Sequence, residues 1–187
     1  MLLSAQYKRW MTELLDAAST LFFKGATPSA LGLKISKKVN IEGTGLDGQV
    51  HTDTTTMKCY VQISETATFM GDAQPMLTKF AIAHELGHAC AAEIGDAIGT
   101  SGLPMGSQKH EIAADLIGTC LLLKTDVTPI MITSALNSYG DFIMDKDATG
   151  THPSQKARMG FISALFTKVR SQKKPEIEAI REVLASS

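Results

Sequence analysis

The sequence has little cysteine, and its cysteines do not form a disulfide or metal-binding pattern. There are three of them, Cys59, Cys90 and Cys120, and no two are separated by two residues. Cys90 and Cys120 fall in apolar stretches with helical spacing, which is typical of buried free thiols. This usage argues against a disulfide-stapled scaffold and indicates a reducing compartment.

Long hydrophobic runs and an excess of one charge are also missing. No uncharged apolar run approaches the length that spans a bilayer. Residues 1–23 carry Lys8, Arg9, Glu13 and Asp16 within their apolar pattern, which breaks a signal-peptide core. The net charge is −1, so nothing predicts a nucleic-acid partner. We expect no membrane insertion and a cytoplasmic location by default, although a dedicated secretion system could export a chain of the same composition.

The remaining composition is that of a globular protein. Of 187 residues, 44% are apolar and 20% are charged, which supplies enough apolar side chain for a core. The length suits one ordinary domain. We predict a single domain over residues 1–187, without internal repeats.

The hydrophobic pattern changes along the chain. Residues 3–23 repeat apolar side chains at helical spacing. Residues 30–64 are rich in Thr, Val, Ile and Gly, and short alternating runs predict strands at Leu31–Val39 and Met57–Ser64, joined by a glycine-rich turn region at Gly43–Gly48.

The second half of the sequence is helical in pattern. Its predicted helices cover residues 75–94, 108–123 and 129–140 and two further stretches that begin near Ser154 and Pro175. The order of these elements predicts an α+β fold with a small N-terminal β-sheet and a mostly helical C-terminal half.

Two histidines enclose a glutamate in the sequence His84-Glu85-Leu86-Gly87-His88. On a helix, positions i and i+4 share a face, so both imidazoles can bind one ion. Glu85 lies about 100° further round the helix, where it can reach a water at the open position of a catalytic zinc site. We predict a zinc site with His84 and His88 as ligands and Glu85 as general base.

The third ligand is expected from the next predicted helix. An extended pattern with a third histidine soon after His88 is absent, because Ala91 and Ile94 stand there. Glu111 can instead complete a two-histidine, one-glutamate site, and Asp115, on the same helix face, can accept the second ring N–H of a ligating histidine. The alternative is that Glu111 only favours a helix N-terminus, which leaves Asp115 in an apolar run unexplained.

The remaining polar candidates receive no role. His110 points about 100° away from Glu111 and is interpreted as a surface or loop histidine. His51 lies in a Thr-rich stretch without partners. Residues 145–150 match the start of a calcium-binding loop, but Lys156 stands where that loop needs a glutamate, so we interpret them as a solvated loop.

The order of the motifs resembles the HtpX/BepA family of gluzincins, which includes the CaaX prenyl endopeptidases. The resemblance is carried by the His84–His88 motif, Glu111-Ile-Ala-Ala-Asp115, and Thr151-His152-Pro153-Ser154 followed by Arg158. It implies a zincin-like fold and a zinc endopeptidase with Glu111 as third ligand, an active-site role for His152, and Arg158 among the supporting residues. The membrane helices of HtpX are absent here, so the resemblance is to soluble members such as the minigluzincins, and membrane substrates are not implied.

The residues around His152 leave its role open. Pro153 holds the histidine in an extended conformation, and Ser154 can cap the following helix. His152 could donate to the oxyanion of a tetrahedral intermediate, occupy the open metal position in a resting state, or simply lie in a surface turn.

Together these patterns predict a zinc-dependent endopeptidase acting on a protein or peptide, which we expect to pair with an edge strand at Met57–Ser64. One alternative is a zinc-binding regulatory protein whose site is silenced by His152. Glu85 argues against it, because a structural site has no use for that acid. Another alternative is a secreted effector or toxin protease with a regulatory or immunity partner.

Overall fold

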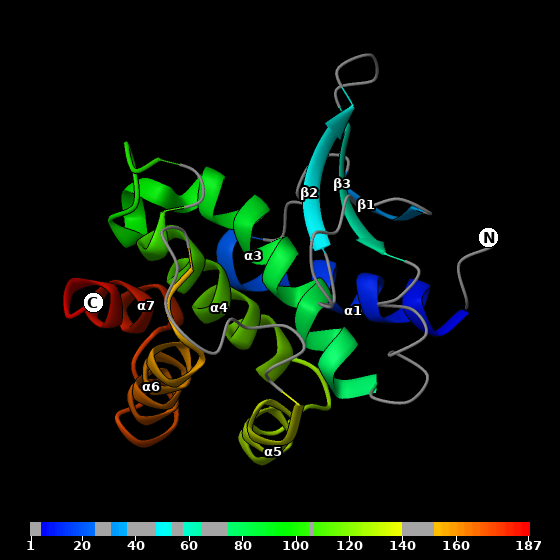
Figure 1. The fold of residues 1–187 in the computed structure, drawn as a ribbon. Coiled ribbons are helices and arrows are strands. Elements are labelled where there is room, and N and C mark those ends of the chain that lie inside the picture. Colours follow the sequence, from blue (N-terminus) through cyan, green and yellow to red (C-terminus); the bar gives the residue numbers. More distant parts are fainter. Residues whose placement is uncertain are drawn as a thin grey trace.

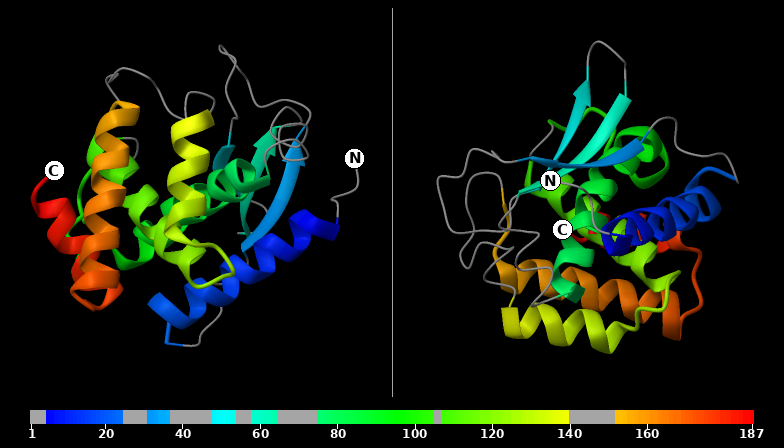
Figure 2. Two further views of the ribbon diagram at one scale, coloured as in Figure 1. Left: turned by 90° about the horizontal axis from the view of Figure 1, so that it is seen from below. Right: turned by 90° about the vertical axis from the view of Figure 1, so that its right-hand side faces the viewer.

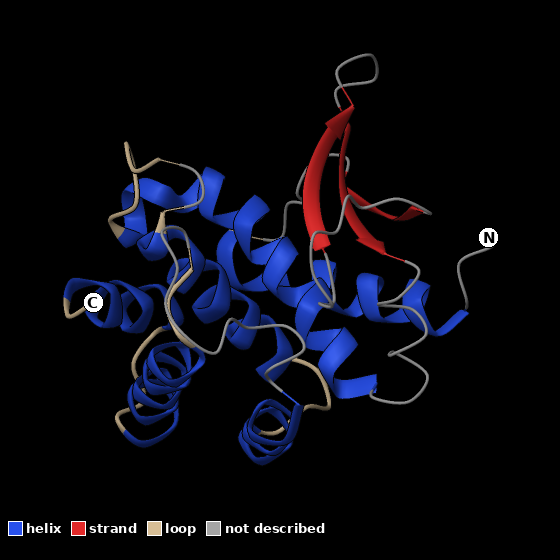
Figure 3. Cartoon of the chain, viewed as in Figure 1, coloured by secondary structure: helices blue, strands red, loops and turns tan. Residues whose placement is uncertain are grey.

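Helices make up most of the part of the chain that the structure describes (Figures 1 and 3). The computed structural model describes residues 5–24, 31–36, 48–53, 58–64, 75–104, 107–139 and 152–187. In chain order the elements are α1 (Ala5–Phe22), β1 (Leu31–Ser36), β2 (Gly48–Asp53), β3 (Lys58–Ser64), α3 (Pro75–Ile98), α4 (Gln108–Leu123), α5 (Pro129–Tyr139), α6 (Gln155–Phe166), the π-helical turn η2 (Thr167–Ser171) and α7 (Glu176–Ala185).

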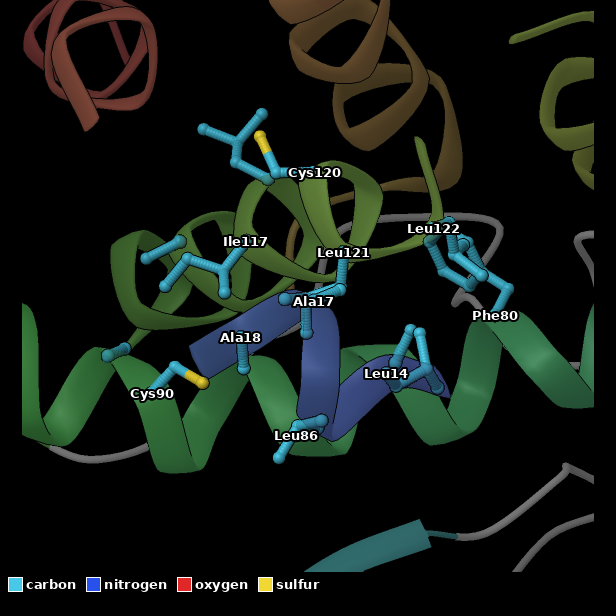
Figure 4. Packing of buried hydrophobic residues seen from close by; sticks show 14 of the residues in the cluster. Leu14, Ala17, Ala18, Phe80, Leu86, Cys90, Ile117, Cys120, Leu121 and Leu122 are labelled. Carbon is cyan, nitrogen blue, oxygen red and sulfur yellow. The ribbon is translucent and has the colours of Figure 1, made fainter. Parts of the chain in front are cut away.

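Helix α4 lies at the centre of the molecule. Nearly all of its residues are buried, and it contacts α1, α3, α6 and α7. Helix α3 runs between α4 on one side and the sheet on the other (Figures 1 and 2), so it is apolar around much of its circumference. Helix α1 completes this core with a buried stripe that includes Leu14, Ala17 and Ala18, which lie next to α3 and α4 in Figure 4.

The three strands form one small sheet in the order β1-β3-β2. Strand β1 is parallel to β3, and β2 is antiparallel to it. Strands β1 and β3 lie within the two segments whose alternation predicts strands. Strand β2 is not predicted, because Val50 is the one aliphatic residue in Gly48–Asp53 and no alternation is visible. Strand β3 is paired on both sides, so the expectation that a peptide docks at Met57–Ser64 is wrong.

The predicted α+β class, with a small N-terminal β-sheet and a mostly helical C-terminal half, is also wrong: the described chain as a whole is predominantly helical. The physical reason lies in the core, which is formed by helices packed around α4. Among the described side chains, the sheet contributes Val61 to that core, and the other core residues come from helices and their connections.

Helices α3 and α4 run antiparallel at very short distance. A Cβ atom placed on Gly87 would lie 2.3 Å from the carbonyl oxygen of Ala114, and one on Gly118 would lie 2.7 Å from that of Ala83. Real Cβ atoms do not approach so closely, so both positions require glycine. The residues of the candidate site flank this contact, and the close approach therefore sets how near the side chains of one helix come to those of the other.

The ends of α3 and α4 follow local rules. Helix α3 continues past the predicted end at residue 94, through Gly95 to Ile98. The chain then turns at Gly99, whose φ of 81° favours glycine. Ser107 caps α4: its side chain accepts a hydrogen bond from the backbone N–H of His110.

No helix in the described ranges combines the length and the apolar character needed to cross a bilayer. The longest, α3 with 24 residues, carries Lys79, Glu85, Glu93 and Asp96 along its length.

Candidate metal centre

Three side chains from α3 and α4 converge on one point. Nε2 of His84 is 3.1 Å from Nε2 of His88. The Glu111 carboxylate closes the triangle, with Oε2 3.3 Å from His84 Nε2 and Oε1 3.4 Å from His88 Nε2. The exposed fractions of the side chains are 12% for His84, 14% for His88 and 8% for Glu111. This group could hold a metal ion, and its composition alone does not specify which metal.

The local sequence explains how the three residues meet. His84 and His88 are one helical turn apart on α3 and so share a face. Glu111 lies in the first turn of α4, and the antiparallel crossing at Gly87 and Ala114 brings that turn opposite the two histidines. The convergence of the predicted ligands therefore depends on the motif in α3 and on the crossing of the two helices.

Behind His84 lies a buried ion pair. Asp115 Oδ1 is 2.8 Å from His84 Nδ1. Arg158, from α6, donates to both Asp115 oxygens, from Nη2 to Oδ1 and from Nε to Oδ2, each at 2.6 Å. Because the Asp115 carboxylate accepts at Nδ1, His84 carries a proton there and turns Nε2 toward Glu111. The structure thus brings together Asp115 and Arg158, as the spacing and the family resemblance predict, although their roles stay predictions.

Electrostatics at the centre favour a cation. Burial lowers the pKa of His84, but hydrogen bonds with Asp115 and Glu111 outweigh it and raise the pKa to about 9. Burial raises the pKa of Asp115, but the charge and hydrogen bonds of Arg158 prevail and lower it to about 2. Burial also opposes the ionisation of Glu111, yet its contacts with His84 and His88 hold its pKa well below the usual range. Two carboxylates therefore stay ionised around the imidazoles at neutral pH.

His88 has a partner that the sequence analysis missed. Its Nδ1 is 3.2 Å from Nδ1 of His110. His110 is buried, with 5% of its surface exposed, so its interpretation as a surface or loop histidine is wrong. The spacing within α4 gives no signal for this contact, because it arises from the crossing of α3 and α4.

Glu85 is buried beside the candidate metal ligands. Burial raises the pKa of its carboxyl, and the nearby charges of His84 and His88 oppose that rise. No hydrogen bond to the Glu85 carboxylate comes from the part of the chain that the structure describes. A carboxylate in such surroundings is a stronger base than one in water, which suits proton abstraction. On the side of α3 opposite the two histidines, Ala83, Leu86 and Cys90 are buried in the core.

His152 approaches the same centre from the start of α6. Its Nε2 is 3.7 Å from Glu111 Oε2, and 42% of its side chain is exposed. Pro153 is buried, and Ser154 caps α6, its Oγ accepting a hydrogen bond from the backbone N–H of Ala157. These two residues fix where the chain enters the helix, and so they hold His152 at the edge of the site.

Two further candidates from the sequence are His51 and the calcium-loop-like segment. His51 is part of β2. The calcium-loop-like residues 145–150 lie outside the described residues.

Comparison with known proteins adds no relative. No protein-family model matches the sequence, no curated protein matches it significantly, and no solved structure does. The resemblance to the HtpX/BepA family therefore stays a prediction.

Proposed function

We propose that this protein is a zinc-dependent endopeptidase whose metal is held by His84, His88 and Glu111. The observation that carries the proposal is the triangle of ligand atoms, with separations of 3.1, 3.3 and 3.4 Å. Ligand atoms about 2.0–2.1 Å from a tetrahedral zinc are about 3.3 Å from one another. Two imidazoles and one carboxylate are also a frequent ligand set of catalytic zinc sites, in which one position stays open for water or substrate.

The residues around the ligands support a catalytic site over a structural one. A structural zinc site uses four protein ligands, whereas the described part of the chain gathers three in one group. Glu85, between the two histidines in sequence, adds a buried carboxylate that does not belong to this group. A base of this kind has a use only where water or substrate reacts.

Each residue then has a distinct task in peptide hydrolysis. Bound zinc would supply a Lewis acid that lowers the pKa of water and polarises the scissile carbonyl. Glu85 takes a proton from the attacking water and delivers it to the nitrogen of the leaving amine. Asp115, held by Arg158, keeps the proton of His84 on Nδ1 so that Nε2 remains the ligand atom.

We place the substrate peptide along β2. This strand contacts α3, which carries Glu85, and among the described strands it is paired with β3 alone. An extended peptide could add to its other edge through backbone hydrogen bonds, which bind with little sequence preference.

A silenced, zinc-binding regulatory protein is the second candidate. It is favoured by His152, whose Nε2 lies within 3.7 Å of a Glu111 carboxylate oxygen and so could compete for the open position. Activity on a generic unfolded protein separates the two candidates, because a silenced site would not hydrolyse it.

The test compares the wild-type protein with Glu85→Gln, each purified without chelator. Both should contain one zinc per chain, because Glu85 is not a ligand, but only the wild type should cleave an unfolded protein substrate. The variants His84→Ala, His88→Ala and Glu111→Ala should lose the zinc itself. Near-full zinc in the histidine variants would refute the ligand assignment, and hydrolysis by Glu85→Gln would refute the mechanism.

The same pair of proteins can identify the natural substrate. A proteomic comparison of cleavage products between wild type and Glu85→Gln would list cleaved proteins. Substrates from a host or a competitor would favour an effector or toxin protease that needs an immunity partner, and substrates from the producing cell would favour a housekeeping peptidase.

A further inference from the structure

We propose that His110 is a positioning residue of the metal centre: it accepts a hydrogen bond from His88 Nδ1 and thereby holds His88 in the tautomer and orientation that bind the metal. This inference rests on the proposed metal site. In this assignment His110 accepts the hydrogen bond from Nδ1 of His88, as Asp115 accepts the one from Nδ1 of His84.

The geometry of the two rings is that of an edge-to-edge hydrogen bond. The Nδ1 atoms are 3.2 Å apart, the ring centroids are 5.3 Å apart, and the ring planes differ by 8°. The distance between the two Nδ1 atoms is much shorter than the distance between the ring centroids. The two nitrogens therefore lie between the rings, and neither ring covers the face of the other. His88 Nε2 then points the other way, toward His84 and Glu111.

The proton count of this contact assigns the donor. Two ring nitrogens at hydrogen-bond distance must share one proton, because two protons would repel and two lone pairs would not bond. A histidine that binds a metal through Nε2 carries its proton on Nδ1. His88 is therefore the donor, and His110 accepts through an unprotonated Nδ1.

His110 is itself firmly held. It lies in the first turn of α4, where its backbone N–H donates to the carbonyl oxygen of Ser107 at 2.9 Å and to the Ser107 side chain at 3.3 Å. Its neighbour in sequence is Glu111, the third ligand. The first turn of α4 thus supplies both the proposed ligand Glu111 and the hydrogen-bond partner of the proposed ligand His88.

The two histidine ligands consequently have different outer partners. His84 donates to the Asp115 carboxylate, which is ionised and bound to Arg158. His88 donates to a neutral imidazole. Removing an outer partner of a metal-binding histidine typically weakens metal affinity by about 10- to 100-fold, and we expect a loss in this range for His110.

The test uses His110→Asn and His110→Leu, side chains of nearly the same shape. Asn places its Oδ1 acceptor as many bonds from Cα as the Nδ1 of histidine, whereas Leu has no acceptor. Both variants lose the ring equally, so packing effects cancel between them. Zinc dissociation constants are measured by competition with a chromophoric chelator, and urea unfolding of the metal-free proteins serves as a check that both variants fold.

We expect His110→Leu to bind zinc about 10- to 100-fold more weakly than the wild type and His110→Asn to recover most of the loss. The absorption spectrum of bound Co²⁺ should change in His110→Leu and remain close to wild type in His110→Asn. Equal zinc affinities of the two variants would overturn the inference. Absence of zinc from the wild-type protein would instead overturn the proposed function, so the two failures are distinguishable.

Discussion

Gly118 of α4 lies against the backbone of Ala83 in α3, with room for a hydrogen atom and none for a methyl group. A Cβ at position 118 would be 2.7 Å from the Ala83 carbonyl oxygen and 3.0 Å from the backbone nitrogen of His84. The contact therefore reaches His84, the first histidine of the candidate metal centre, directly. Backbone atoms cannot move aside as the end of a flexible side chain can, so the helices themselves would have to separate.

We predict that Gly118→Ala destabilises the protein by about 1–3 kcal/mol, the usual cost of overpacking a core, and also weakens zinc binding. The second effect is expected because His84 and Glu111 sit on the two helices that are forced apart. Urea unfolding of the metal-free protein and a zinc titration measure the two effects separately.

A matched control is Gly160→Ala. Gly160 lies within α6, is exposed, and a Cβ there meets nothing within 4 Å. Alanine favours a helix over glycine by up to about 1 kcal/mol, so this variant should be neutral or slightly more stable. If Gly118→Ala behaved like Gly160→Ala, the close packing of α3 and α4 would not be needed for the site.

Much of this site is predictable because its pattern is local. The spacing of His84 and His88, and that of Glu111 and Asp115, reports which residues share a helix face, since helical geometry is set within a few residues. The cap at Ser154 is local in the same sense. The contacts between α3 and α4 cannot be predicted from local spacing. They depend on the packing of Gly118 against Ala83, and the sequence does not indicate which glycine packs against which part of the backbone.

The two main errors follow from that limit. His110 reaches His88 only through the crossing of the two helices, so its spacing within α4 points away from the site. The α+β prediction rested on segments of alternating hydrophobicity. Such alternation indicates strands, but it does not indicate what share of the core the sheet contributes. In this protein the helices around α4 build most of the described core.

We predict that Arg158→Met is strongly destabilising. It takes from the Asp115 carboxylate, which is 1% exposed, the guanidinium that pairs with both of its oxygens. Breaking a buried ion pair by removing one partner typically costs about 3–5 kcal/mol. The double variant Asp115→Asn/Arg158→Met removes both charges and should recover part of that loss in urea unfolding.

The control for this pair is Arg9→Ala, which removes the exposed partner of Glu13 on α1. Solvent screening makes such surface pairs weak, so its unfolding curve should nearly overlay that of the wild type. Equal stability of Arg158→Met and the wild type would show that the Asp115–Arg158 pair does not support the centre.

Zinc affinity should rise with pH. The metal-free protein binds a proton at His84 with a pKa of about 9 against an ordinary value of 6.5, so this group stabilises the metal-free fold below about pH 6.5 and loses that effect as pH rises through 9. Zinc must displace the same proton. Affinity should therefore increase by up to about tenfold per pH unit between pH 6.5 and 9 and then level off.

This pH dependence is measured by chelator competition in a series of buffers. Asp115→Asn removes a hydrogen bond that raises the His84 pKa, so in that variant the rise should end at lower pH. A zinc affinity that is flat over this range in the wild type would contradict the protonation of His84 in the metal-free protein.

The two active-site roles considered for His152 predict opposite effects of His152→Ala on catalytic activity. If its imidazole stabilises the developing oxyanion, His152→Ala should lower turnover by on the order of a hundredfold with zinc retained. If it occupies the fourth metal position in a resting enzyme, the same change should raise basal activity, because that position must be vacant for water and substrate.

Two observations favour the first role. Among the described residues, the group that could hold a metal contains His84, His88 and Glu111 but not His152, and the His152 side chain is 42% exposed, a position at the rim of the site from which it can face a bound substrate. Pro153 and Ser154 hold it there under either role, so stability should be unchanged. The measurement is a paired assay of wild type and His152→Ala on one unfolded substrate, with the zinc content of both. Unchanged turnover with full zinc would leave His152 a turn residue without a part in the reaction.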